Sequence, residues 1–122
     1  MLTRLTGLFH NHLPQLIVFD LDGTLVDSVP DLAAAVDRMR VQLGLAPAGE
    51  DKVRGWVGNG AALLVRRALA DSADPAAVAQ VNDEQHLQAL HVFRTCYHEE
   101  NGLQTRLYPG VTDVLQVLSD LQ

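Results

Sequence analysis

The stretch QLIVFDLDGTLVDS, residues 15–28, decides how the chain is interpreted. After Gln15 it begins with four consecutive apolar residues, which is typical of a short strand buried on both faces of a parallel sheet. Asp20 and Asp22 follow at once, and Gly23 allows the chain to turn sharply. Ligands of open α/β sheets bind beyond the carboxyl ends of the strands, so the sequence predicts a functional edge at these two aspartates.

Two carboxylates at such an edge suit phosphoryl transfer. An aspartate is ionised at neutral pH and needs no base to act as a nucleophile, provided that a divalent cation offsets its repulsion from a phosphate. A second carboxylate two residues further on can protonate the leaving-group oxygen. Two alternatives compete with this interpretation. Asp-Gly is also a common turn dipeptide, whereas a calcium loop counted from Asp20 would need Gly where the chain has Leu25.

The residues after the motif predict a helix. Ser28 followed three residues later by Asp31 resembles a capping box, and Pro30 is tolerated in a first helical turn. Gly44 is a natural terminator. An apolar stripe at helical spacing consists of Leu32, Val36, Met39 and Leu43.

Three further helices are predicted, and a loop over residues 45–51 precedes them. One begins at Asn59 or Gly60. The next has Asp74 as its N-cap and runs without interruption as far as Gly102. The last covers residues 111–122. No second strong strand pattern follows the first one, although a parallel strand needs a returning partner. The pattern therefore predicts the front portion of an α/β protein.

Composition narrows the class of protein. The 122 residues fit one domain, and 48% hydrophobic with 20% charged residues is typical of a folded globular chain. A net charge of −6 without a basic cluster argues against nucleic-acid binding. No apolar run is long enough for a membrane span. Cys96 is the single cysteine, so an intrachain disulfide is excluded, and we expect a cytoplasmic protein without a secretory signal.

The string FDLDGTLVDS, residues 19–28, resembles the first motif of the haloacid dehalogenase superfamily. The resemblance implies an α/β parent fold, a Rossmann-like core with an inserted α-helical cap. On this chain it implies a partial core at residues 15–27 and 107–122 and a cap at residues 28–106. Residues 1–14 would be an N-terminal leader. The 122 residues would then be mostly helical, with one clear core strand.

The same resemblance implies a chemistry. Asp20 would be the nucleophile that forms an aspartyl-phosphate, and Asp22 would be the general acid/base. The Asp20 side chain and the Asp22 backbone carbonyl would ligate Mg²⁺, and Gly23 and Thr24 would bind the phosphate. Residues 27–39, 53–69 and 107–111 are similar to the bacterial phosphoglycolate phosphatase family, which implies hydrolysis of 2-phosphoglycolate. Asn59 and Arg67 are candidate substrate contacts.

The chain also departs from the family pattern. The later motifs of the family supply a phosphate-binding hydroxyl, a lysine and a further acidic pair, and we find no place for them here. Lys52, the chain's one lysine, belongs to the predicted cap. We therefore expect little or no turnover by the chain alone. Alternatives are another sugar-phosphate phosphatase or mutase, or a non-catalytic helical module for oligomerisation or binding. Strand 15–19 could pair with a second copy, as a homodimer or strand swap.

Overall fold

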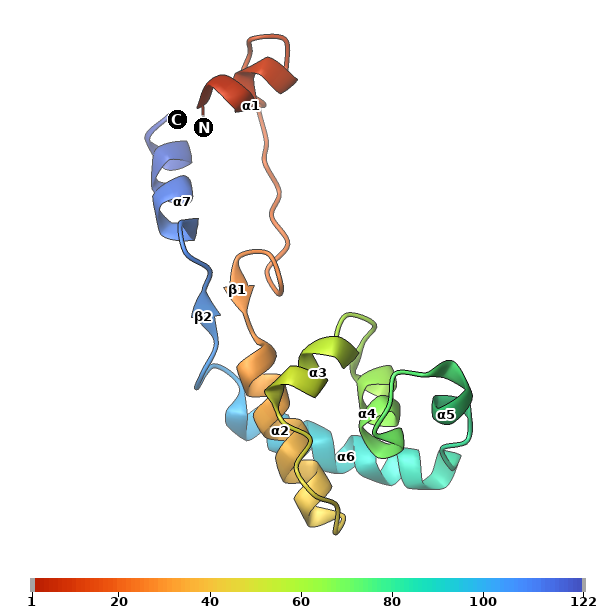
Figure 1. The fold of residues 1–122 in the computed structure, drawn as a ribbon. Coiled ribbons are helices and arrows are strands. Elements are labelled where there is room, and N and C mark those ends of the chain that lie inside the picture. Colours follow the sequence, from red (N-terminus) through yellow and green to blue (C-terminus); the bar gives the residue numbers. More distant parts are fainter. Residues whose placement is uncertain (1, 122) are drawn as a thin grey trace.

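The computed structural model describes residues 2–121, and it is mostly helical (Figure 1). The helices are α1 (Leu2–Leu8), α2 (Val29–Gln42), α3 (Glu50–Trp56), α4 (Ala61–Ala70), α5 (Pro75–Ala79), α6 (Asp83–Glu100) and α7 (Val111–Asp120). The strands are β1 (Val26–Asp27) and β2 (Arg106–Leu107).

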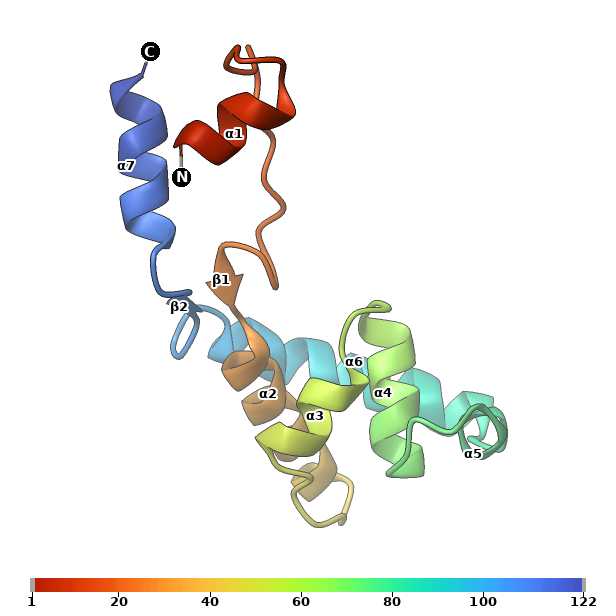
Figure 2. The same ribbon diagram turned by 45° about the horizontal axis from the view of Figure 1, so that its top comes forward.

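Helices α2 to α6 form one packed unit, which we call the helical body (Figure 2). Helix α2 packs against α3, α4 and α6, and α4 also packs against α5 and α6. The apolar stripe of α2 is confirmed, because Val36 and Met39 are fully buried and Leu32 and Leu43 pack against the core. The other side chains that fill this core most completely are Val53, Val65, Phe93 and Cys96.

Two predictions, one of a loop and one of a helix, were wrong. The predicted loop 45–51 overlaps the start of α3, because the chain turns into a helix directly after Gly49, which has a φ of 89°. The predicted long helix after Asp74 is two helices. The Asn82 side chain accepts a hydrogen bond from Gln85 N at 3.0 Å, so it caps a new helix and interrupts the old one. The Asp74 cap itself is confirmed.

The capping box predicted at Ser28 was also wrong. The Ser28 side chain makes no capping hydrogen bond, although Pro30 does lie in the first turn of α2. The Asp31 carboxylate points instead to residues 102–105, which follow α6.

Two short connections join the helical body to the rest of the chain. Strand β1 leads into α2, and β2 follows α6 after residues 101–105. The strands pair antiparallel, with Val26 opposite Leu107 and Asp27 opposite Arg106. Helices α1 and α7 both lie beyond this ladder, at the end away from the helical body, as Figures 1 and 2 show.

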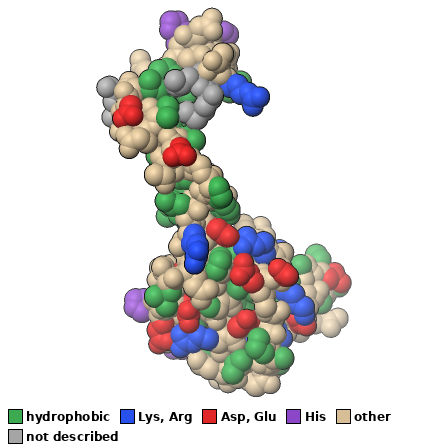
Figure 3. Space-filling model, turned by 60° about the vertical axis from the view of Figure 1, so that its left-hand side comes forward, with side chains coloured by type: hydrophobic (Ala, Val, Ile, Leu, Met, Phe, Trp, Pro, Cys, Tyr) green, Lys and Arg blue, Asp and Glu red, His purple; other side chains and the backbone are tan. Residues whose placement is uncertain are grey.

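The strand predicted at residues 15–19 is not formed within the described part of the chain. Residues 16–20 run as a stretched, unpaired segment between α1 and β1 (Figure 1). Leu16 and Val18 are 78% and 82% exposed, and no residue of α7 is buried. Figure 3 shows hydrophobic side chains along this narrow part of the molecule. The physical reason is that a buried strand needs neighbouring strands, and β1 and β2 are the only strands among residues 2–121.

Among residues 2–121, none of the helices combines the length and the apolar character that a membrane span requires.

Candidate functional site

The two motif aspartates lie in a tight loop just before β1. Three backbone amides, those of Thr24, Leu25 and Val26, donate to the Leu21 carbonyl oxygen at 3.3, 2.9 and 3.1 Å. Gly23 N donates back to Val26 O at 2.9 Å, and Gly23 has a φ of 77°, which favours glycine. The loop is therefore held by its own backbone hydrogen bonds, and its sequence determines its shape.

Both carboxylates are accessible. Asp20 and Asp22 are exposed, and within residues 2–121 the one side-chain hydrogen bond of the pair is local, from Leu21 N to Asp20 Oδ1 at 3.0 Å. Exposed carboxylate and carbonyl oxygens are the donor type that Mg²⁺ prefers, and in proteins this ion often keeps several waters beside one or two carboxylates. Within residues 2–121, however, no three side chains of His, Cys, Asp and Glu are grouped so that they could hold a metal ion. The donor type fits magnesium, and the set of side chains is incomplete.

Gly23 and Thr24 were predicted to bind phosphate, and their backbone amides are already used within the loop. Both residues are exposed. A phosphate that accepts from these amides would have to replace the bonds to Leu21 O and Val26 O. The hydroxyl of Thr24 is a further possible donor, so phosphate binding here stays a prediction.

Asn59 and Arg67, the predicted substrate contacts, touch each other. Arg67 Nη1 donates to Asn59 Oδ1 at 3.0 Å and to Trp56 O at 2.6 Å. Asn59 stands between Gly58 and Gly60, whose φ angles are 115° and 89°. Arg67 thus holds the turn between α3 and α4, and its Nε is buried without a hydrogen-bond partner among the described residues.

Arg54, a cationic side chain of α3, is bound to two carboxylates. Its guanidinium donates to both oxygens of Asp27 at 3.2 and 3.0 Å and to Glu50 at 3.0 Å. These hydrogen bonds hold the pKa of Asp27 below its ordinary value and raise the pKa of Arg54. The pair joins β1 to α3, so it ties the first connection to the helical body. A free carboxylate ligand would have to displace Asp27.

Asp31 makes a second tie that sequence reasoning missed. It is fully buried, and its carboxylate accepts hydrogen bonds from Gly102 N at 2.9 Å, Gln104 N at 2.7 Å, Thr105 N at 3.1 Å and Thr105 Oγ1. Burial alone would raise the pKa of this carboxyl, but the four hydrogen bonds outweigh burial and lower it from 3.8. The partners follow Asp31 by more than seventy residues, so no local pattern could have revealed them.

The motif loop lies within electrostatic range of the helical body. Tyr97 stacks on Phe93 with ring centroids 5.8 Å apart, and its pKa is raised by burial, then by the negative charges of Asp22 and Asp31. Burial is thus the main cause of the raised pKa of Tyr97, and the charge of Asp22 adds to it.

The family of the chain follows from comparison with known proteins. A family model described as haloacid dehalogenase-like hydrolase matches residues 14–122. The chain belongs to this family.

Its relatives include two phosphatases of Pseudomonas. The chain is 58% identical over 111 residues to a phosphoglycolate phosphatase of Pseudomonas putida (strain KT2440), a match that covers 91% of this chain. It is 52% identical over 110 residues to phosphoglycolate phosphatase 1 of Pseudomonas aeruginosa (strain PAO1), which covers 90% of the chain. In both cases the match spans only 39% of the relative's length.

The fold matches solved structures of the same class. The crystal structure of a predicted phosphoglycolate phosphatase from Haemophilus somnus 129PT aligns with a TM-score of 0.68 and 37% identity, over 84% of this chain and 45% of that one. A putative phosphoglycolate phosphatase from Lactobacillus delbrueckii subsp. bulgaricus aligns equally well at 25% identity, over 81% and 47%. The parent fold is therefore α/β with a helical cap, as the motif predicted.

Proposed function

We propose that this chain carries the nucleophile loop and the cap of a magnesium-dependent phosphatase that hydrolyses 2-phosphoglycolate to glycolate and phosphate. One observation carries the proposal: residues 20–24, Asp-Leu-Asp-Gly-Thr, form an exposed loop in a chain 58% identical to a protein named phosphoglycolate phosphatase. In this proposal the cap is residues 28–106, which contain the helical body. The loop belongs to the partial core at residues 15–27 and 107–122.

The chemistry divides between two side chains. A carboxylate oxygen of Asp20 attacks phosphorus, and the bond from phosphorus to the glycolate oxygen breaks as Asp22 protonates that oxygen. Water then attacks the aspartyl-phosphate while Asp22 takes up its proton, which releases phosphate and restores both residues. Mg²⁺ on the Asp20 carboxylate and the Asp22 carbonyl would offset the repulsion between the two anions. Asn59 and Arg67 are proposed to contact the carboxylate end of the substrate.

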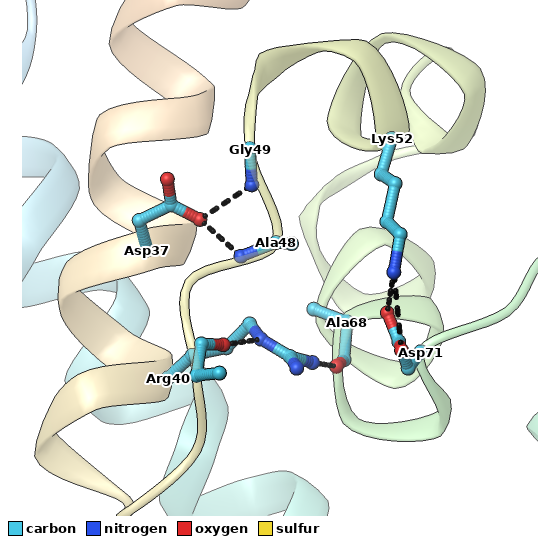
Figure 4. A network of polar contacts seen from close by, with 8 residues as sticks. Asp37, Arg40, Ala48, Gly49, Lys52, Ala68 and Asp71 are labelled. Carbon is cyan, nitrogen blue, oxygen red and sulfur yellow. Dashed lines mark hydrogen bonds and ion pairs between the residues drawn. The ribbon is translucent and has the colours of Figure 1, made fainter.

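Residues 1–122 alone are proposed to have little or no turnover. The charges of the substrate and of the phosphoryl group need cationic partners in the transition state. Lys52, the chain's one lysine, lies on α3 and pairs with Asp71 at 3.0 Å (Figure 4). Because Lys52 belongs to this ion pair on the helical body, we do not assign it to the binding of a phosphate beside Asp20.

The test is a complementation assay. Phosphate release from 2-phosphoglycolate with Mg²⁺ is measured for the chain alone, and for the chain mixed with the part of the Pseudomonas putida relative that the match does not cover. We expect release only from the mixture, and we expect Asp20→Asn to abolish it. Asp51→Asn, an exposed aspartate of α3, is the matched control and should keep the activity. Full release by the Asp20→Asn mixture would refute the proposal.

A substrate panel then tests the specificity. The mixture is assayed with 2-phosphoglycolate and with a set of hexose and pentose phosphates at equal concentration. We expect the highest kcat/KM for 2-phosphoglycolate. A preference for a sugar phosphate would identify another phosphatase or mutase of the family. We propose a cytoplasmic location together with this function, because a small phosphorylated metabolite as substrate suits it.

A further inference from the structure

We propose that Asp31 is a positioning residue that sets the orientation of the motif loop relative to the helical body. The assignment of a catalytic role to that loop rests on the proposed function. The positioning itself rests on contacts of Asp31 alone.

The first step concerns the hydrogen bonds between Asp31 and the second connection, which is residues 101–107. Its Oδ1 accepts from Gln104 N, and its Oδ2 accepts from Gly102 N, Thr105 N and the Thr105 hydroxyl. Asp31 lies in the first turn of α2 and is fully buried. Three backbone amides after α6, those of Gly102, Gln104 and Thr105, are thus fixed to the start of α2. Hydrogen bonds to an ionised acceptor inside the protein are stronger than neutral ones.

The second step runs from this segment to the loop. Thr105 directly precedes β2, which pairs with β1. One residue beyond β2, Tyr108 N donates to Leu25 O at 3.1 Å, and Leu25 is held to the Leu21 carbonyl within the motif loop. Hydrogen bonds at Thr105 and Tyr108, together with the backbone of residues 105–108 between them, therefore connect Asp31 to the loop that carries Asp20 and Asp22.

The third step is that few other interactions fix the two connections relative to the helical body. The β1–β2 ladder has two residue pairs, so it fixes the direction of the chain only weakly by itself. The Asp27–Arg54 pair anchors the first connection, but its side chains are 25% and 43% exposed and salt screens such pairs. Asp31 is the buried anchor of the second connection, and it does not depend on exposed charges.

The experiment is amide hydrogen exchange on the 122-residue chain, with Asp31→Asn. An Asn side chain keeps one acceptor oxygen, but its NH₂ group faces N–H and O–H donors and cannot accept hydrogen bonds from them. We expect exchange at Gly102 and Thr105 to accelerate by about ten-fold or more. The deciding reporter is Tyr108 N, for which we expect an acceleration of about three-fold or more, while the Phe93 amide in the core of α6 keeps its rate.

The matched control is Asp37→Asn on the same helix. Asp37 Oδ1 accepts from Ala48 N at 2.7 Å and Gly49 N at 3.1 Å, so this carboxylate also holds backbone amides, but within the helical body (Figure 4). The control should accelerate exchange at Ala48 and Gly49 and leave Tyr108 unchanged.

Three results would overturn the proposal: an unchanged Tyr108 in Asp31→Asn, an equal acceleration of Phe93, or an equal effect of Asp37→Asn on Tyr108. Where Asp31→Asn does not fold, Thr105→Val removes a single donor and must accelerate Tyr108 for the proposal to stand. No phosphatase assay enters the test, so its failure would leave the proposed function untouched. Failure of the complementation assay would likewise leave Asp31 unaffected.

Discussion

Replacement of Arg40 by Ala is expected to destabilise the helical body strongly. Arg40 is 7% exposed, and its Nε donates to Ala46 O at 2.7 Å while Nη1 donates to Ala68 O (Figure 4). Ala68 lies in the last turn of α4, where carbonyl groups lack donors from their own helix. Arg40 therefore caps the C-terminus of α4 from a neighbouring helix, and its positive charge also suits that end of the helix.

The expected loss in the free energy of unfolding follows from these two hydrogen bonds of Arg40. A hydrogen bond to a charged group contributes about 1.5–3 kcal/mol. Ala46 is exposed, so its carbonyl can return to water, whereas Ala68 is fully buried and its carbonyl would lose its partner. We therefore expect Arg40→Ala to lower the free energy of unfolding by about 2–4 kcal/mol, because one bond counts fully and the other in part.

The assay is urea unfolding followed by far-UV circular dichroism, with Arg38→Ala as the matched control. Arg38 lies two residues earlier on α2 and pairs with Glu99 and Glu100, but its side chain is 41% exposed. Exposed ion pairs contribute little, so the control should lose only a small fraction of what Arg40→Ala loses. Equal losses in the two variants, or an Arg40→Ala variant within about 0.5 kcal/mol of wild type, would refute the assigned role.

Three further outcomes are expected. Phe93→Ala should cost about 3–5 kcal/mol in the same urea assay, because the ring is 2% exposed, whereas Phe93→Leu should cost much less. The pKa of Asp31 is lowered on folding, so its contribution is present above the unfolded value of 3.8 and is lost as pH falls through the folded one. The stability difference between wild type and Asp31→Asn should therefore shrink below pH 3.8, as acid titrations of urea midpoints would show. Cys96, 1% exposed, should react with a thiol reagent only after unfolding; rapid reaction of the native chain would contradict the packing.

Local patterns predicted the parts of the fold that depend on local contacts. The α2 stripe with Val36 and Met39, the Asp74 cap and the motif loop all follow from residues a few positions apart. The interruption at Asn82 is also local, and an Asn followed by two acidic residues could have revealed it.

Long-range contacts explain what the sequence could not predict. Asp27 binds Arg54, which follows it by 27 residues, so no local pattern indicates the pair. Asp31 looked like the partner of a helix cap, yet it binds a segment beyond α6. The strand at residues 15–19 was expected because its composition suits a buried sheet, but composition does not supply the neighbouring strand that defines one.

The candidate site thus depends on two sets of hydrogen bonds, one within the motif loop and one in the connections. We expect the two sets to respond separately to mutation. The loop around Asp20 and Asp22 is closed by bonds to the carbonyl of Leu21, between residues at most five positions apart, so its shape needs no contribution from the helices. Its orientation toward the helical body depends instead on the connections, and there the buried carboxylate of Asp31 is the strongest tie. Because the two sets of bonds share no atoms, a change at Asp31 should move the loop as a unit without altering its internal geometry. In the proposed enzyme such a change would alter how the cap covers the nucleophile while the nucleophile itself stays intact.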